Sequence, residues 1–358
     1  MSMIDFWTTL SKPFFALAPM EDVTDAAFRQ LIARYRKPDV MFTEFTSADG
    51  LVLADEKGRK KLRQKLLYSE SERPIVAQIF SSVPENIEKA SKLVAELGFD
   101  GVDINMGCPD RAVEKSGCGA ALIKNSALAR DLIRAAKKSG LPVSLKTRIG
   151  YNEDELDFWL PELLFENPAA ITIHARTRKE MSDVPARWER IKHAVEIRDS
   201  LGSKTFIIGN GDVKDIEGAR AKAHETLCDG VMLGRAIFGN PWLFADVGHL
   251  YIPTPEEKIR ALLEHLALFE ELLADTANYA AMKKHFKAYI SGWSAGPACP
   301  ACPACPACPA CPACAGMAGM AGTAGMAGIP GAKELRARLM DTNSLEMARD
   351  ILECYTRS

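Results

Sequence analysis

Short runs of apolar residues recur along the first 235 residues of the chain, and most of them end in a polar or reactive side chain. Each run is bounded by turn residues, which is typical of buried β-strands. The pattern therefore predicts strands at 14–20, 40–45, 74–80, 101–105, 142–148, 170–176, 205–210 and 230–235.

The segments between these runs carry apolar residues at helical spacing, most clearly at 86–97, 127–136, 156–165 and 188–201. Strand and helix therefore alternate, which predicts a parallel sheet. Eight strands buried on both faces favour closure into a (β/α)8 TIM barrel of the α/β class. An open doubly wound sheet is the alternative. The turn from Ala18 to Asp22 has no G-x-G-x-x-G, so a nicotinamide-type Rossmann site is not expected.

The chain of 358 residues is longer than one barrel, which typically takes about 250 residues. We expect a catalytic (β/α)8 barrel domain at 1–250 and a smaller helical domain at 251–358. Apolar stripes predict helices at about 254–290 and again at 333–355. Between them, Pro-Ala-Cys and Ala-Gly-Met repeats at about 295–330 predict a low-complexity insert that is neither helix nor strand.

The net charge of −2 does not by itself demand nucleic acid or an anionic membrane as a partner. An RNA partner must therefore be held by local basic patches. No apolar run is long enough to span a bilayer, and the first ten residues lack a basic region before an apolar core. We expect a cytoplasmic protein that does not bind a membrane.

Six of the ten cysteines lie in the repeat, where C-P-A-C has the C-x2-C spacing of zinc knuckles and redox dithiols. A zinc knuckle also needs a second ligand pair from a separate element, and a redox dithiol needs a βαβ context. Neither accompanies the repeat, so no metal site is predicted. The other four cysteines are expected to be reduced thiols.

Two glycine-containing segments follow the seventh and eighth predicted strands, where this fold holds phosphate groups. They are Asn210-Gly211-Asp212 and Gly234-Arg235. Glycine lets backbone N–H groups approach phosphate oxygens, the following helix start adds a favourable dipole, and Arg235 supplies a cation. The alternative is a pair of ordinary turns, since Asn-Gly is a common turn dipeptide.

Lys146 and Gln78 end the fifth and third strands inside apolar runs. A lysine at a barrel mouth with no adjacent acid is expected to face a bound anion. On a flavin it would stabilise the negative charge that collects on reduction, and Gln78 would pair with the pyrimidine edge. The alternative is a lysine whose stem covers apolar surface. His174 and Arg176 lie two residues apart on the sixth strand and so point to the same side.

Cys108 stands between Gly107 and Pro109 in a loop directly after the fourth strand. A buried structural cysteine would gain little packing there. A reactive cysteine serves as nucleophile or proton donor, and the absence of a partnered His-Asp pair favours proton donation. The alternative is a small inert hydrophobic residue.

Taken together, these motifs resemble the tRNA dihydrouridine synthase family of flavoenzymes, which reduce a uridine base in tRNA. The matching segments occur in the family's order and at the expected strands. The resemblance implies an FMN-binding barrel and a helical tRNA-binding domain, with Lys283-Lys284-His285-Phe286 in a basic helix. The segments are 18–25, Gln78, 105–109 with 119–122, 146–148, 174–177, 210–212 and 234–235.

Carried over residue by residue, the resemblance implies that Cys108 is the general acid and that Asn105 holds the target base. Arg176 is a further candidate for substrate contact. In the implied cycle NADPH reduces FMN, hydride goes to C6 of the uracil, and Cys108 protonates C5. The target base must leave its stack to enter the barrel mouth. The residues implied to surround FMN are Pro19, Met20, Gln78, Lys146, His174, Asn210, Gly211, Asp212, Gly234 and Arg235.

Two features depart from the family pattern. Ala112 stands where many relatives carry a basic residue, and the repeat interrupts the helical domain. Two other functions remain open: an FMN barrel oxidoreductase of the dihydroorotate dehydrogenase kind, and an RNA-binding barrel that has lost catalysis. The basic C-terminal helices argue against the first, and the retention of Cys108 and Lys146 argues against the second. No stable protein partner is expected.

Overall fold

The computed structural model describes residues 5–245, 251–290 and 331–356. The chain divides into two compact units, Met1–Ala236 with Leu243–Leu250, and Ile237–Trp242 with Tyr251–Ser358. The low-complexity insert expected at about 295–330 lies outside the described residues. So does the part of the chain around residue 250, where the boundary between the domains was expected.

The first unit is built on a parallel sheet whose strands follow the order β1-β9-β8-β7-β6-β5-β4-β2. A parallel bridge between Ala16 and Val40 joins β1 to the residue just before β2, which brings the two ends of the order together. The predicted (β/α)8 barrel is therefore confirmed, as are all eight predicted strands. The strands are β1 (Phe14–Leu17), β2 (Met41–Phe42), β3 (Thr46–Ser47), β4 (Ile75–Phe80), β5 (Gly101–Met106), β6 (Val143–Arg148), β7 (Ala170–His174), β8 (Phe206–Asn210) and β9 (Gly230–Leu233).

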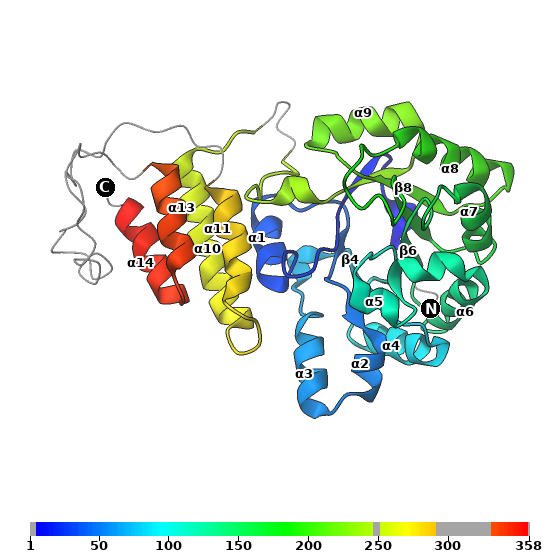
Figure 1. Cartoon of the computed structure of the whole chain (residues 1–358), viewed down its shortest axis with the longest axis horizontal. Helices are drawn as coiled ribbons and strands as arrows, with labels where there is room; N and C mark the ends of the chain where they lie inside the picture. Colours follow the sequence, from blue (N-terminus) through cyan, green and yellow to red (C-terminus); the bar gives the residue numbers. More distant parts are fainter. Residues whose placement is uncertain (1–4, 246–250, 291–330, 357–358) are drawn as a thin grey trace. The chain divides into compact units, whose positions relative to one another are not determined.

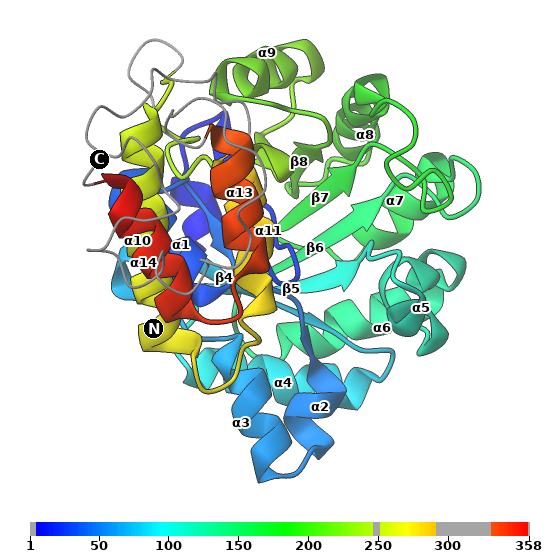
Figure 2. The ribbon, with the colours of Figure 1, turned by 60° about the vertical axis from the view of Figure 1, so that its left-hand side comes forward.

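Helices cover the outside of these strands, as Figures 1 and 2 show. Several begin at a side-chain cap, such as Asp25 before α1 and Asn125 before α6, whose oxygens accept backbone N–H groups of the first turn. The helices of this unit are α1 (Ala26–Arg36), α2 (Ala48–Leu53), α3 (Glu56–Gln64), α4 (Pro84–Glu96), α5 (Arg111–Lys115), α6 (Ser126–Lys137), α7 (Leu156–Leu164), α8 (Trp188–Ser200) and α9 (Ile216–Thr226). Short 3-10 helices are η1 (Phe6–Thr9), η2 (Glu70–Glu72), η3 (Gly119–Lys124) and η4 (Arg235–Ile237).

An apolar cluster of buried side chains fills part of the barrel interior. Trp7 of η1 packs against Phe14 and Phe42, with ring centroids 5.7 and 6.4 Å away. Val76 and Ile208 belong to the same cluster. Because side chains two residues apart on a strand point to the same side, Gln78 and Asn210 share the inward face with them. The interior therefore changes from apolar to polar toward the carboxyl ends of the strands. The other buried members are Ala16, Ala18, Val40, Ala170 and Met232.

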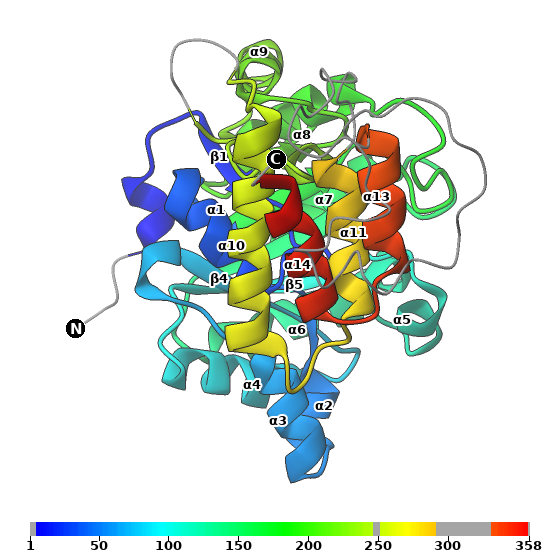
Figure 3. The ribbon, with the colours of Figure 1, turned by 90° about the vertical axis from the view of Figure 1, so that its left-hand side faces the viewer.

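The second unit contains α10 (Pro255–Leu273), α11 (Ala280–Tyr289), α13 (Ala332–Asp341) and α14 (Leu345–Thr356), which Figure 3 shows alongside one another. The helix α10 starts with a capping box formed by Thr254 and Glu257. Its inward face includes Leu262, Leu266 and Phe269, as the apolar stripe predicted. In the segment expected to be a basic helix, His285 and Phe286 are buried core residues. Among the described residues, no helix is long and apolar enough to cross a membrane.

Candidate functional site

Strand register brings the predicted polar residues to one end of the barrel. Asn105 of β5 is aligned with Lys146 of β6, and His174 of β7 is aligned with Asn210 of β8. Aligned residues on neighbouring strands point to the same side of the sheet. These four side chains therefore project inward at the carboxyl ends of the strands, where this fold carries its active sites.

A chain of buried hydrogen bonds runs across β4, β5 and β6. The Nδ2 of Asn105 donates to Oε1 of Gln78 at 3.0 Å, and Nε2 of Gln78 donates to Oδ2 of Asp103 at 2.7 Å. Ser144 donates to the other oxygen of Asp103 at 2.6 Å. Burial raises the pKa of the Asp103 carboxyl to about 6. Two neighbours, Asn105 and Asp103, thus fix the amide of Gln78. The structure places this predicted residue in direct hydrogen-bond contact with Asn105.

The loop that carries Cys108 is fastened to Asn105. The Oδ1 of Asn105 accepts the backbone N–H of Gly107 at 3.1 Å and that of Cys108 at 2.9 Å. The carbonyl of Cys108 accepts the N–H of Ala120 at 2.9 Å. Gly119 allows this approach, because its φ is +59° and a Cβ there would lie 2.6 Å from the Cys108 carbonyl oxygen. The loop of Cys108 is therefore tied to both Asn105 and η3.

Burial raises the pKa of the Cys108 thiol, whereas the nearby cations of Arg148 and Lys146 lower it by smaller amounts. The thiol is therefore protonated at neutral pH and stands beside positive charges that would stabilise its thiolate. Cys118 is fully buried at the start of η3, with its Sγ 3.6 Å from the carbonyl oxygen of Ser116.

Lys146 is a half-buried cation with few partners. Its Nζ donates to Oδ1 of Asn210 at 3.3 Å, and no carboxylate lies within ion-pair distance of it among the described residues. Burial is the main cause that lowers the pKa of Lys146 to about 8, and Arg148 lowers it further. Asn210 in turn donates to the carbonyl of Met232 at 2.8 Å, which orients its amide. A half-buried ammonium held in this way favours an anionic ligand.

His174 and Arg176 contact each other, although β7 ends at His174 and Arg176 lies just beyond it. The Nη1 of Arg176 lies 3.0 Å from Nε2 of His174, and Arg176 also pairs with Asp212 and donates to the carbonyl of Val184 at 2.6 Å. Arg176 is only 2% exposed. Burial first, and then neighbouring cations led by Lys146, lower the pKa of His174 to about 2, so its imidazole is neutral.

The two predicted phosphate segments are joined by one carboxylate. Asp212 accepts Nη2 of Arg235 at 2.7 Å and the backbone N–H of Ala186 at 2.8 Å, and the Arg235 side chain is 63% exposed. Arg235 thus stays accessible to a further anion. The helix that follows this segment is α9. Its N-terminus, which was expected to add a favourable dipole, is capped by Asp215, whose side chain accepts the N–H of Gly218 at 2.7 Å.

Pro19 and Met20 lie in the turn after β1, both half-buried. The hydroxyl of Thr24 accepts the backbone N–H of Met20 at 2.9 Å, which fixes the turn. Gly234, after β9, faces the same turn, since a Cβ on it would lie 3.7 Å from Sδ of Met20. The structure therefore brings the first and last strands of the barrel together at the site.

Arg148 is a residue of the candidate site to which the sequence motifs assigned no role. Its Nε donates to the carbonyl of Gly107 at 2.8 Å, and its Nη1 donates to the carbonyls of Thr177 at 3.0 Å and Met181 at 3.3 Å. Arg148 thereby joins the Cys108 loop to the loop after β7. Its place two residues after Lys146, on the same side of the predicted strand, was the available signal.

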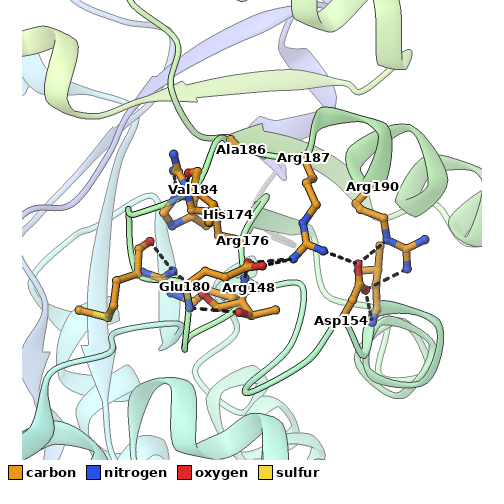
Figure 4. Close-up of polar contacts among 12 residues, drawn as sticks. Arg148, Asp154, His174, Arg176, Glu180, Val184, Ala186, Arg187 and Arg190 are labelled. Atoms are coloured by element: carbon orange, nitrogen blue, oxygen red, sulfur yellow. Dashed lines mark hydrogen bonds and ion pairs between the residues drawn. The ribbon is translucent and has the colours of Figure 1, made fainter.

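The loop between β7 and α8 is held by further ion pairs, shown in Figure 4. Glu180 accepts the backbone N–H of Thr177 at 2.7 Å and Nη2 of Arg187 at 2.8 Å. Asp154 pairs with Arg190 at 2.8 Å and lies 3.8 Å from Arg187. This network fixes the loop beside His174 and Arg176.

The family model described as dihydrouridine synthase matches residues 16–298 of the chain. "Probable tRNA-dihydrouridine synthase 2" of Bacillus subtilis is 38% identical over 355 residues, covering 99% of this chain and 97% of that protein. A "Probable tRNA-dihydrouridine synthase" of Staphylococcus epidermidis is 37% identical over 353 residues, covering 98% and 96%. Among solved structures, histamine dehydrogenase from Rhizobium sp. 4-9 is similar over 71% of this chain and 48% of that chain, with 12% identity and a TM-score of 0.49.

Proposed function

The chain belongs to the dihydrouridine synthase family, and from this premise we propose that it is a tRNA-dihydrouridine synthase. It is an oxidoreductase that reduces the C5=C6 bond of a uridine in tRNA. FMN is its cofactor and NADPH its reductant. The observation that carries the proposal is the assembly of Asn105 and the protonated Cys108 beside the half-buried cation of Lys146.

The chemistry of the side chains at the barrel mouth fits FMN. Lys146 is a half-buried cation that donates a hydrogen bond to Asn210, so it suits the pyrimidine edge of a flavin, where negative charge collects on reduction. The accessible Arg235, held by Asp212, suits the phosphate. In this proposal Pro19, Met20, Gly211 and Gly234 contact the part of FMN between these two cations. The neutral His174 supplies a hydrogen-bonding group without adding a charge.

Gln78 and Arg176 have narrower roles in this proposal. Gln78 has no exposed surface, and its amide is bonded to Asn105 and Asp103, so it orients the residue that meets the uracil. Arg176 pairs with Asp212 and lies against His174, so it shapes the phosphate side of the site. The proposal also includes contact of Gln78 with FMN and contact of Arg176 with the substrate or a phosphate group.

Reduced FMN, when bound, supplies the hydride that is added to C6 of the uracil. The Nδ2 group of Asn105, fixed by Gln78, holds the base edge. The Sγ–H of Cys108 donates its proton to C5. Burial keeps this thiol protonated until the reaction, and the cations of Arg148 and Lys146 then stabilise the thiolate that forms. A proton from solvent restores the thiol.

The experiment that tests the function is position-resolved mass spectrometry of tRNA. Purified protein is incubated with FMN, NADPH and tRNA transcribed without modifications. Dihydrouridine at one defined position is the expected result, and the position names the target uridine.

Other outcomes would contradict the proposal in distinguishable ways. Bound FMN and oxidised NADPH with no dihydrouridine would indicate an oxidoreductase of small molecules. A colourless protein that does not take up added FMN would indicate an RNA-binding barrel without catalysis.

A further inference from the structure

A strongly basic helix interrupts the otherwise balanced charge of the barrel unit. Between Asp55 and Lys65 the sequence has six cations and two carboxylates, whereas the whole chain has a net charge of −2. Most of this segment forms α3, which buries none of its residues. The charge therefore lies on a surface helix and not in the core.

Most cations of α3 have no anionic neighbour. Lys65, just after the helix, pairs with Glu21. Within the described residues, no ion pair or side-chain hydrogen bond involves the five others, and all five are exposed. These five, called here the α3 cations, are Lys57, Arg59, Lys60, Lys61 and Arg63.

Three surface lysines elsewhere on the barrel do have carboxylate partners. Lys89 and Lys92 of α4 pair with carboxylates one turn earlier at 2.7 Å, and Lys138 after α6 pairs with Glu88 at 2.7 Å. Such pairing of lysines with nearby carboxylates is typical of a solvated helix face. The helix α3 lacks it, so an ordinary surface role does not account for its composition.

The structure also fixes which side of α3 is free. Leu62 is the one apolar side chain of the helix, and it contacts α2, since its Cδ1 is the atom nearest to a Cβ built on Gly50. Gly58, one turn earlier, lies against Ala54. The α3 cations occupy the remaining sides. An amphipathic helix that inserts into a membrane needs an exposed apolar face, and α3 turns its apolar side to α2.

The helix stands at the same end of the barrel as the candidate site. The short strand β3, which leads directly into α2, pairs with Ile79 and Phe80, the last two residues of β4. The α2 and α3 helices therefore leave the barrel at the carboxyl ends of the strands, where Cys108 and Lys146 lie. Figures 1 and 2 show the two helices projecting from the barrel.

We propose that the α3 cations bind the phosphate backbone of the RNA whose uridine enters the barrel mouth. This inference rests on the proposed function. A polyanion gains affinity from each unpaired cation through the release of condensed counterions. Phosphate contacts of this kind position the RNA without reading its sequence. The barrel unit thus supplies a docking surface of its own.

The test compares two triple variants of the full-length chain. The first is Arg59→Gln, Lys60→Gln, Arg63→Gln in α3. The control is Lys89→Gln, Lys92→Gln, Lys138→Gln, which removes the same charge from α4 and the end of α6. The Kd for unmodified tRNA is measured by fluorescence anisotropy between about 50 and 200 mM salt. Turnover at saturating tRNA is measured in parallel.

In the α3 variant we expect the Kd to rise by at least about tenfold at 0.1 M salt, and the slope of log affinity against log salt to fall by about 2. The control should keep the wild-type slope. Turnover at saturating tRNA should stay unchanged in the α3 variant, because these residues are remote from the reacting atoms.

Four results would overturn the inference: an unchanged Kd and slope in the α3 variant, an equal loss in the control, a wild-type chain that binds no tRNA, or α3-dependent binding of phosphatidylserine vesicles with tRNA affinity unaffected. Failure of the proposed function has a different signature. In that case the wild-type chain forms no dihydrouridine, while the α3 variant still binds RNA more weakly.

Discussion

Cys108 and Cys118 lie ten residues apart in the sequence, and the structure gives them different surroundings. Cys108 is half-buried, and its backbone N–H is held by Asn105, whereas Cys118 has no exposed surface. We predict that Cys108→Ala keeps FMN but lowers uridine reduction by roughly 10²- to 10⁴-fold, the usual effect of losing a general acid. Cys118→Ala is the matched control and should retain turnover. Dihydrouridine formation and flavin absorbance are the measurements, and full activity in Cys108→Ala would contradict the assignment.

Lys146 predicts a pH dependence of flavin binding. Burial lowers its pKa to about 8, so the side chain is a cation below pH 8 and becomes neutral as the pH rises through that value. FMN affinity should therefore fall above about pH 8. Lys146→Gln should bind FMN roughly 10- to 100-fold more weakly at pH 7, the effect of losing a hydrogen bond from a charged group. In this variant FMN affinity should no longer depend on pH between pH 7 and 9. Fluorescence titration of FMN measures both the affinity and its pH dependence. If FMN affinity declined equally with pH in the variant, Lys146 would not be part of the flavin site.

At the scale of single elements, the turn into η3 positions Cys108. Gly119 and Gly140 both have positive φ, but a Cβ on Gly119 would strike the Cys108 carbonyl oxygen, while a Cβ on Gly140 would meet nothing within 4 Å. We predict that each Gly→Ala change costs about 1–2 kcal/mol of stability because of the left-handed backbone. Only Gly119→Ala should also lower turnover, since it displaces the loop of the proton donor. Urea unfolding and steady-state assays separate the two effects, and normal turnover in Gly119→Ala would show that the loop tolerates the shift.

At the scale of the whole molecule, the second unit should lose stability in acid. His265 of α10 and His285 of α11 are fully buried in the second unit, with ring centroids 4.4 Å apart. Burial lowers the pKa of both, that of His285 to about 3. The unfolded chain therefore takes up protons below about pH 6.5 that the folded unit does not. Stability of this unit is complete above pH 6.5 and is lost as the pH falls toward 3.

Hydrogen exchange of α10 and α11, measured at about pH 7.5 and pH 5 and corrected for intrinsic rates, should reveal the loss. His285→Gln should reduce the difference between the two pH values, because glutamine does not titrate. His224→Gln, at an exposed position on α9, is the control and should leave it unchanged. Equal protection at both pH values in the wild-type chain would show that the pair does not set acid stability.

The sequence by itself determined the barrel, its eight strands and the positions of Cys108 and Lys146, because strand periodicity and turn residues are local properties of the chain. Only the tertiary structure decided how those residues work together. The bonds from Asp103 through Gln78 to Asn105 join two strands, and Arg148 binds carbonyls more than 25 residues away on both sides of it. Asp212 joins Arg176 to Arg235 in the same manner. Hydrogen bonds and ion pairs between distant segments have no periodic signature, so their partners are settled when the strands align.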